Sequence, residues 1–134
     1  MLPKENRLNK KADFNLVSKK GQIVQSKNFG LAYLVTGAST PPKFGFIVSN
    51  KISKRAVDRN RIKRILRQII RELIKDDQSG LALSTANGLL LVLLARKSIL
   101  DASPNELKKE LVGNLKQISA LEIKNQILNI KITD

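Results

Sequence analysis

The most regular pattern of hydrophobic and polar positions along the chain lies between Lys51 and Lys75. Its apolar residues recur at intervals of three and four, at Ile62, Ile65, Leu66, Ile69, Ile70, Leu73 and Ile74. At 100° per residue, this spacing places them on one side of an α-helix. The pattern therefore predicts a long helix that ends near Lys75 and buries an aliphatic face.

Shorter patterns predict the remaining elements of the fold. β-forming residues indicate four strands, at 22–26, 29–35, 43–49 and 88–95. In the second strand, Phe29, Leu31 and Tyr33 share one face, and the unbroken apolar run of the last strand indicates burial on both faces. Helical signals, among them a capping box from Ser103 to Glu106, indicate helices at 10–19 and from 103 to about 118.

The segments between and after these elements are less regular. Turn-forming residues at 37–42 and 76–87 predict loops. In residues 119–134, some apolar positions alternate as in a strand, while others continue a helical spacing. Both interpretations of this tail remain open.

The composition fits one domain, residues 1–134, with an aliphatic core. Hydrophobic residues make up 42% of the chain and aromatic residues only 4%, and a chain of this length can bury a core without disulfides. There is no cysteine, and the amino terminus lacks the apolar segment of a signal peptide. The longest apolar run, 89–95, is far too short to cross a bilayer. These features predict a soluble, cytoplasmic protein without a membrane partner.

Positive charge is the second strong signal. The formal net charge is +14, and ten of the 25 basic residues fall between Lys51 and Lys75. Five recur every four residues, at Arg59, Lys63, Arg67, Arg71 and Lys75, and Arg61 and Arg64 extend this arc to the side of the predicted helix opposite its apolar face. A solvated surface helix usually alternates acids with bases, whereas these like charges repel one another at i,i+4. A polyanion relieves that repulsion, which favours a nucleic-acid partner, with an anionic membrane surface as the alternative.

The chain offers little chemistry of its own. It has no histidine, the commonest general base. Its 11 acidic residues are dispersed, and the adjacent pair Asp76 and Asp77 is more typical of a solvated helix end than of a metal site. No glycine-rich phosphate loop is present. The residues therefore favour a binding subunit with neither a catalytic nor a metal site in the protein.

Ordered motifs add a resemblance to a known family. One long motif resembles the arginine–asparagine–arginine signature of the bacterial ribonuclease P protein subunit: Val48-Ser49-Asn50-Lys51, then Ala56-Val57-x-Arg59-Asn60-Arg61-x-Lys63-Arg64-x-x-Arg67. Other segments of that family are similar to Arg7-Leu8-x-Lys10-x-x-Asp13-Phe14, Gly45–Ser49 and Leu93–Lys97. The likeness covers most of residues 7–118. Two positions depart from the family pattern: Asn50 stands where lysine is usual, and Ser18 where a second aromatic residue is frequent.

The resemblance implies an accessory subunit that binds a catalytic RNA and the 5′ leader of precursor tRNA, and assists in the endonucleolytic removal of that leader. The nuclease activity then belongs to the RNA-based holoenzyme, which requires Mg²⁺, and no stable protein partner is expected. Contacts with the catalytic RNA are expected at Lys54, Arg55, Arg59, Asn60, Arg61, Lys63, Arg64, Arg67 and Arg71. Contacts with the leader are expected in a groove for single-stranded RNA, at Arg7, Phe14, Tyr33, Lys51 and Arg96. For Phe14 and Tyr33, ordinary packing in the core remains the alternative.

By the same resemblance, the fold is α+β, a two-layer α/β sandwich. Its four-stranded mixed sheet is expected to pack against the long basic helix and the carboxy-terminal helix. The family carries a left-handed βαβ crossover, which ordinary handedness rules would not predict. Composition alone leaves two alternatives: a different RNA-binding protein, such as a ribosomal protein of similar form, and a membrane-surface or partner-binding module built on the basic helix. The order of the motifs favours the ribonuclease P protein subunit over both.

Overall fold

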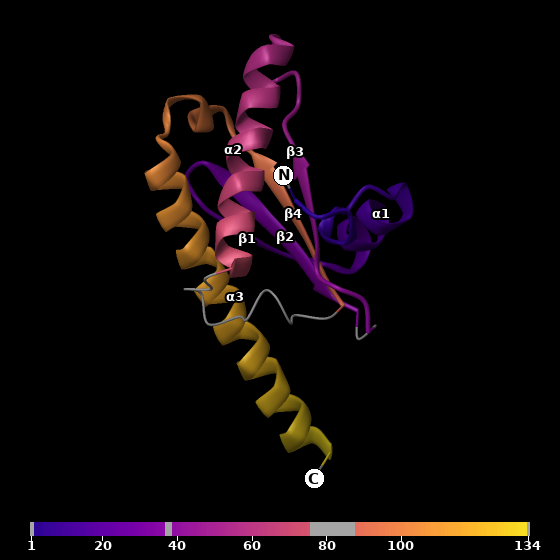
Figure 1. Cartoon of the computed structure of the whole chain (residues 1–134). Helices are drawn as coiled ribbons and strands as arrows, with labels where there is room; N and C mark the ends of the chain where they lie inside the picture. Colours follow the sequence, from indigo (N-terminus) through magenta and orange to yellow (C-terminus); the bar gives the residue numbers. More distant parts are fainter. Residues whose placement is uncertain (1, 37–38, 76–87, 134) are drawn as a thin grey trace.

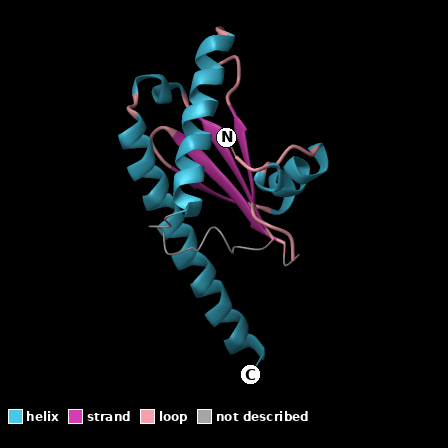
Figure 2. Ribbon diagram, in the orientation of Figure 1, coloured by secondary structure: helices cyan, strands magenta, loops and turns pink. Residues whose placement is uncertain are grey.

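The computed structural model describes residues 2–36, 39–75 and 88–133. In these ranges the elements are, in chain order, η1 (Lys4–Asn6), α1 (Lys11–Lys20), β1 (Gln22–Gln25), β2 (Phe29–Val35), β3 (Lys43–Ile47), α2 (Ala56–Lys75), β4 (Leu89–Ala95), η3 (Lys97–Asp101) and α3 (Pro104–Thr133). Figures 1 and 2 show a sheet with α2 and α3 on one side and α1 beside the other. The predicted α+β fold is confirmed, and the loop predicted at 76–87 lies outside the described residues.

The sheet is mixed and has the strand order β1-β2-β4-β3. β2 pairs antiparallel with both β1 and β4, whereas β3 pairs parallel with β4. The parallel pair is joined through α2, as in any βαβ unit. In Figure 1 the chain rises through β3, crosses in front of the sheet in α2 and returns into β4 on the left of β3, which is the left-handed sense.

The main core lies between the sheet and the two helices α2 and α3. The sheet contributes Phe29, Leu31 and Tyr33 from β2, which share one face as predicted, together with alternate residues of β4. α2 buries most of its predicted stripe, at Ile62, Leu66, Ile69, Ile70 and Leu73. Each fully buried aliphatic side chain of this kind contributes about 1.5–3 kcal/mol to folding. The stripe therefore holds α2 in a single orientation on the sheet.

A smaller cluster covers part of the opposite face. Val17 of α1 and Leu8 pack there against Leu90 and Val92 of β4. β4 is therefore buried on both faces, as its unbroken apolar run predicted. α1 leaves the rest of this face open, and residues of all four strands line a hollow there.

α3 begins and continues as a regular helix. At its start the Glu106 backbone N–H donates to Ser103 Oγ at 3.2 Å, as in the predicted capping box. The helix then extends to Thr133, so the tail continues the helix and does not form a strand. Within the described parts of the chain, no helix combines the length and apolar character that a bilayer crossing demands.

A polar cluster fixes α3 to the hairpin of β1 and β2. The Glu110 carboxylate accepts hydrogen bonds from Ser26 Oγ at 2.6 Å, from the Asn28 backbone N–H at 2.9 Å and from Asn28 Nδ2 at 2.7 Å. Asn114 Nδ2 donates to Ser26 Oγ at 3.0 Å. Asn28 is buried, and these bonds give partners to its backbone N–H and its side-chain amide nitrogen. The hairpin and α3 are thereby locked together.

Candidate nucleic-acid interface

The outward face of α2 presents a row of cations to solvent. Because the apolar stripe packs against the sheet, the basic side chains beside and opposite the stripe lie at the surface, four of them exposed and Arg59 and Lys63 half-buried. We call this set the cation row: Arg59, Arg61, Lys63, Arg64, Arg67 and Arg71. None of the six forms an ion pair with a residue that the structure describes. Their mutual repulsion is therefore uncompensated by the described part of the protein.

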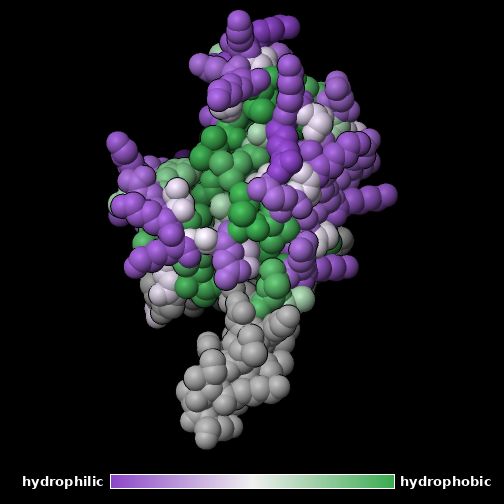
Figure 3. Space-filling view, turned by 180° about the vertical axis from the view of Figure 1, so that it is seen from behind, coloured by the Kyte–Doolittle hydropathy of each residue, from purple (hydrophilic) through white to green (hydrophobic). Residues whose placement is uncertain are grey.

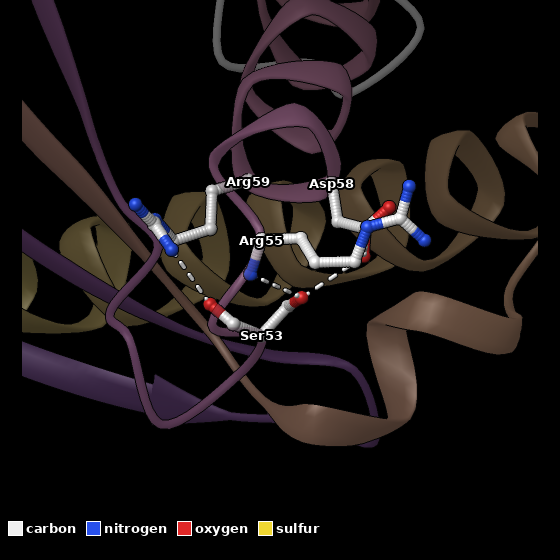
Figure 4. Close-up of polar contacts among 4 residues, drawn as sticks. All are labelled: Ser53, Arg55, Asp58 and Arg59. Carbon is white, nitrogen blue, oxygen red and sulfur yellow. Dashed lines mark hydrogen bonds and ion pairs between the residues drawn. The ribbon is translucent and has the colours of Figure 1, made fainter.

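Ser53 organises the residues at the start of α2 (Figure 4). Its hydroxyl donates to Asp58 Oδ2 at 2.9 Å and accepts from the Arg55 backbone N–H at 3.2 Å. Its carbonyl accepts from Arg59 Nη1 at 2.8 Å, while Arg55 Nε lies 4.0 Å from Asp58 Oδ2. These contacts hold two guanidinium groups near the helix start, and a guanidinium carries five N–H donors in all. Arg55 and Arg59 therefore retain guanidinium N–H groups that can donate hydrogen bonds to a ligand.

An open groove lies on the face of the sheet opposite α2. This sheet groove has a volume of about 430 Å³ and runs between α1 and the strands. Its lining is mostly apolar, at Phe14, Val17, Ile23, Ala32, Ile47, Val92 and Leu94, with Asn15, Ser18, Gly21 and Gln22 beside them. Figure 3 views the molecule from behind and shows hydrophobic residues along the middle of this face, with hydrophilic residues around them. Apolar surface within a basic protein suits the bases of a single strand.

Phe14 connects the sheet groove with a second hollow at the β3 edge. Its ring lies against Gly45, where an added Cβ would sit 2.9 Å from both Cε1 and Cζ of the ring. The second hollow, of about 170 Å³, is also lined by Arg7, Phe46 and Arg67. The Arg67 guanidinium lies 6.0 Å from the centroid of the Phe46 ring, within cation–π range. The cation row and the sheet groove therefore meet around this edge.

Comparison with known proteins identifies the family. The family model described as ribonuclease P matches residues 2–119. A ribonuclease P protein component from Bacillus mycoides is 35% identical over 123 residues, which cover 92% of this chain and 99% of that protein. One from Pseudanabaena sp. is 42% identical over 81 residues, covering 60% and 70%. The chain belongs to the ribonuclease P protein family.

Solved structures of ribonuclease P proteins share the fold. The protein from Staphylococcus aureus superimposes with a TM-score of 0.68 at 24% identity, covering 87% of this chain and 96% of that one. The protein from Thermotoga maritima gives a TM-score of 0.66 at 25% identity, covering 83% and 96%. As a member of this family, the chain is part of an endoribonuclease and serves tRNA 5′ leader processing as an RNA-associated subunit.

The residues predicted to contact the ribonuclease P RNA lie together. All nine belong to α2 or to the segment directly before it, and each is exposed or half-buried: Lys54, Arg55, Arg59, Asn60, Arg61, Lys63, Arg64, Arg67 and Arg71. A single rigid helix thus positions most of them. The nine residues therefore form one continuous basic surface.

The residues predicted to contact a leader are only partly brought together. Arg7 and Phe14 line the same hollow at the β3 edge. Lys51 and Arg96 are exposed, and they follow the carboxyl termini of β3 and β4. Because these two strands are parallel, both termini lie at the same end of the sheet. They therefore lie near the end of the sheet groove where Ile47 and Leu94 pair.

Tyr33 is a correction to the predicted leader site. Its side chain is only 2% exposed and packs in the main core, on the face of the sheet that α2 and α3 cover. Its hydroxyl donates to Gln22 Oε1 at 3.0 Å. Ala32, the residue before it, lines the sheet groove, so alternation along β2 turns Tyr33 to the opposite face. The prediction that Tyr33 shares a groove with Phe14 is wrong.

Two isoleucines of the sheet groove were missed by the sequence analysis. Ile23 is 51% exposed and Ile47 is 41% exposed, unusual values for large aliphatic residues in strands. The alternation of side chains along β1 could have identified Ile23. Its neighbour Val24 is buried in the main core, so Ile23 must lie on the opposite face of the sheet. An aliphatic residue out of phase with the buried face of a strand indicates a second apolar surface.

Proposed function

We propose that this chain binds the RNA component of ribonuclease P through the cation row, and the 5′ leader of precursor tRNA through the sheet groove. The observation that carries the proposal is the cation row itself, which is exposed or half-buried and forms no ion pairs with the described residues. Guanidinium groups are planar and match the oxygens of a phosphate. The buried stripe of α2 holds the row in place, so little ordering is needed when RNA binds.

The sheet groove supports the second half of the proposal. Phe14 offers one aromatic surface, and Ile23, Ile47 and Leu94 offer aliphatic surface beside it. Stacking and apolar contacts accept any base, which suits a subunit that acts on many tRNA precursors. Ser18 lines the groove where the family often has a second aromatic residue, so this chain relies on Phe14 for stacking.

The catalytic centre is assigned to the RNA component. The sequence has no histidine, and the described residues include no cluster of three acidic, histidine or cysteine side chains that could hold a metal ion. We propose that the holoenzyme uses Mg²⁺ and that the RNA component holds it. The protein contributes binding and positioning, and we place the assembly in the cytoplasm, where bacterial tRNA precursors are made.

Neutralising two members of the cation row tests the first half of the proposal. Arg67→Gln with Arg71→Gln removes two exposed guanidinium groups and keeps the side chains long and helix-compatible. Binding to ribonuclease P RNA is expected to weaken, and the slope of log affinity against log salt is expected to flatten by roughly one to two units, one per lost phosphate contact. Fluorescence anisotropy with labelled ribonuclease P RNA, across a salt series, measures both.

The matched control removes the same charge from α1. Lys11→Gln with Lys19→Gln also deletes two exposed cations from a helix, but on the opposite side of the sheet. This pair is expected to leave the salt slope for ribonuclease P RNA almost unchanged. If both double variants flatten the salt slope equally, binding depends only on the net charge of the protein. The assignment of the RNA site to the cation row is then refuted.

A further inference from the structure

A further hollowed surface begins between α2 and α3 and continues along α3. Two adjoining hollows, of about 380 Å³ and about 470 Å³, share the lining residues Asn105 and Lys108 of α3. The first hollow reaches α2 at Arg64, Ile65, Gln68, Ile69 and Glu72, and the second continues along α3 at Lys109, Val112, Gly113 and Lys116. A Cβ built on Gly113 would meet nothing within 4 Å, so the surface there is open. We call this surface the helix groove.

The helix groove is positively charged. Lys109 and Lys116 are exposed, and neither forms an ion pair with a residue whose side chain the structure describes. They lie seven residues apart on the same helix, which separates them by about 10 Å along its axis. That spacing lets the two ammonium groups contact different phosphates of one strand. The groove is thus a second surface, beyond the sequence motif on α2, that favours a polyanion.

Glu72 is the acidic residue of the helix groove. Its carboxylate accepts hydrogen bonds from Gln68 Nε2 at 3.2 Å and from Lys108 Nζ at 3.2 Å. The pKa of Glu72 lies below its ordinary value, mainly because of the hydrogen bond from Gln68 and secondly because of the hydrogen bond from Lys108. The carboxylate is therefore charged at neutral pH and neutralises Lys108, which leaves Arg64, Lys109 and Lys116 as the uncompensated cations lining the groove.

We propose that the helix groove binds the phosphate backbone of ribonuclease P RNA, as an extension of the surface formed by the cation row. Arg64 belongs to both surfaces, so one RNA can pass from the outer face of α2 onto α3 without a break. The lining alternates cations with amides and half-buried aliphatic residues, which suits a sugar–phosphate backbone better than an apolar protein partner. This inference rests on the proposed function, since it names a second contact with the same RNA.

Neutralising the two unpaired lysines tests the inference. In the full chain, Lys109→Gln with Lys116→Gln is expected to weaken binding to ribonuclease P RNA and to flatten its salt slope by roughly one to two units. The loss is expected to add to that of the Arg67 and Arg71 double variant, because the two pairs contact different phosphates. The Lys11 and Lys19 double variant is again the control of equal charge.

Glu72→Gln is a second test, in which the affinity for ribonuclease P RNA is expected to rise instead of fall. It removes the negative charge of the groove and releases Lys108, and the exposed ion pair that it breaks contributes little to stability. Affinity for ribonuclease P RNA is expected to rise roughly two- to fivefold at low salt. Glu5→Gln removes the same charge from η1 beside β3, and it is expected to have a smaller effect.

The outcomes separate this inference from the proposed function. If the lysine variant binds ribonuclease P RNA like the parent while the Arg67 and Arg71 variant is weakened, the helix groove is refuted and the cation row stands. If neither variant is weakened, both assignments fail. If the lysine variant loses affinity only for precursor tRNA, the helix groove binds precursor tRNA, and its assignment to ribonuclease P RNA is refuted. Weaker binding by the Glu72 variant would also contradict it.

Discussion

Replacement of Gly21 by alanine is expected to lower the free energy of unfolding by about 2 kcal/mol, within the range for overpacking in well-packed sites. A Cβ at this position would lie 2.7 Å from the Tyr33 carbonyl oxygen and closer still to that of Val17. Both obstacles are backbone atoms, which cannot move aside as the end of a side chain can. Gly21 has an ordinary φ of −76°, so lack of space, and not backbone strain, is the cause. Urea unfolding followed by circular dichroism measures the change.

Gly113→Ala is the matched control for this prediction. The added methyl group meets nothing within 4 Å in the interior of α3. Since alanine is the better helix former, the variant is expected to gain about 0.5–1 kcal/mol. The two glycine substitutions should therefore shift the urea midpoint in opposite directions. A Gly21 variant as stable as the parent would show that the connection between α1 and β1 can shift to make room.

Phe14→Leu is expected to weaken binding of leader-bearing precursor tRNA roughly five- to hundredfold, the equivalent of one stacked base. Leucine keeps the aliphatic contact with the sheet but removes the aromatic face that borders the sheet groove. Affinity for mature tRNA and for ribonuclease P RNA is expected to stay unchanged, because neither ligand has a leader. Equal losses for all three ligands, together with a lowered melting temperature, would mean that Phe14 only supports the fold.

Gly45→Ala tests the same groove with Phe14 intact. The new methyl group would lie 2.9 Å from the Phe14 ring, so the ring must move off β3. The ring is the free end of a side chain, so the fold can adjust at small cost. Leader affinity is expected to fall in the same direction as in the Phe14 variant, again without loss of binding to mature tRNA. Unaltered leader affinity in both variants would remove Phe14 from the site.

The elements were predictable because their periodicities are strong. α2 ends at Lys75, where its pattern of apolar residues ends, and β4 is buried on both faces as its composition required. The capping box at Ser103 placed the start of α3 correctly. The extent of α3 was open, because the same aliphatic residues suited a strand and a helix. The short helix η3 (Lys97–Asp101) carries no comparable signal in the sequence.

The interface was predictable only where one element decides the geometry. The cation row follows from α2 alone, since its buried stripe determines which side faces solvent. Alternation along β2 showed that Phe29, Leu31 and Tyr33 share a face, but not which face the helices would cover. That choice depends on the crossover from β3 to β4, a long-range feature. The helix groove likewise depends on how α2 packs against α3, so Lys109 and Lys116 could not be singled out.

The place of β4 in the sheet dictates an order of events during synthesis. β4 is the last of the described strands to leave the ribosome, yet it lies between β2 and β3 and is the described strand that joins them in one sheet. It also carries Val92 and Leu94 of the sheet groove. A nascent chain that stops short of residue 89 therefore displays the full charge of α2 with no finished sheet beneath it. On the ribosome, the cations of α2 are thus synthesised before the sheet that holds this helix in its orientation can be completed.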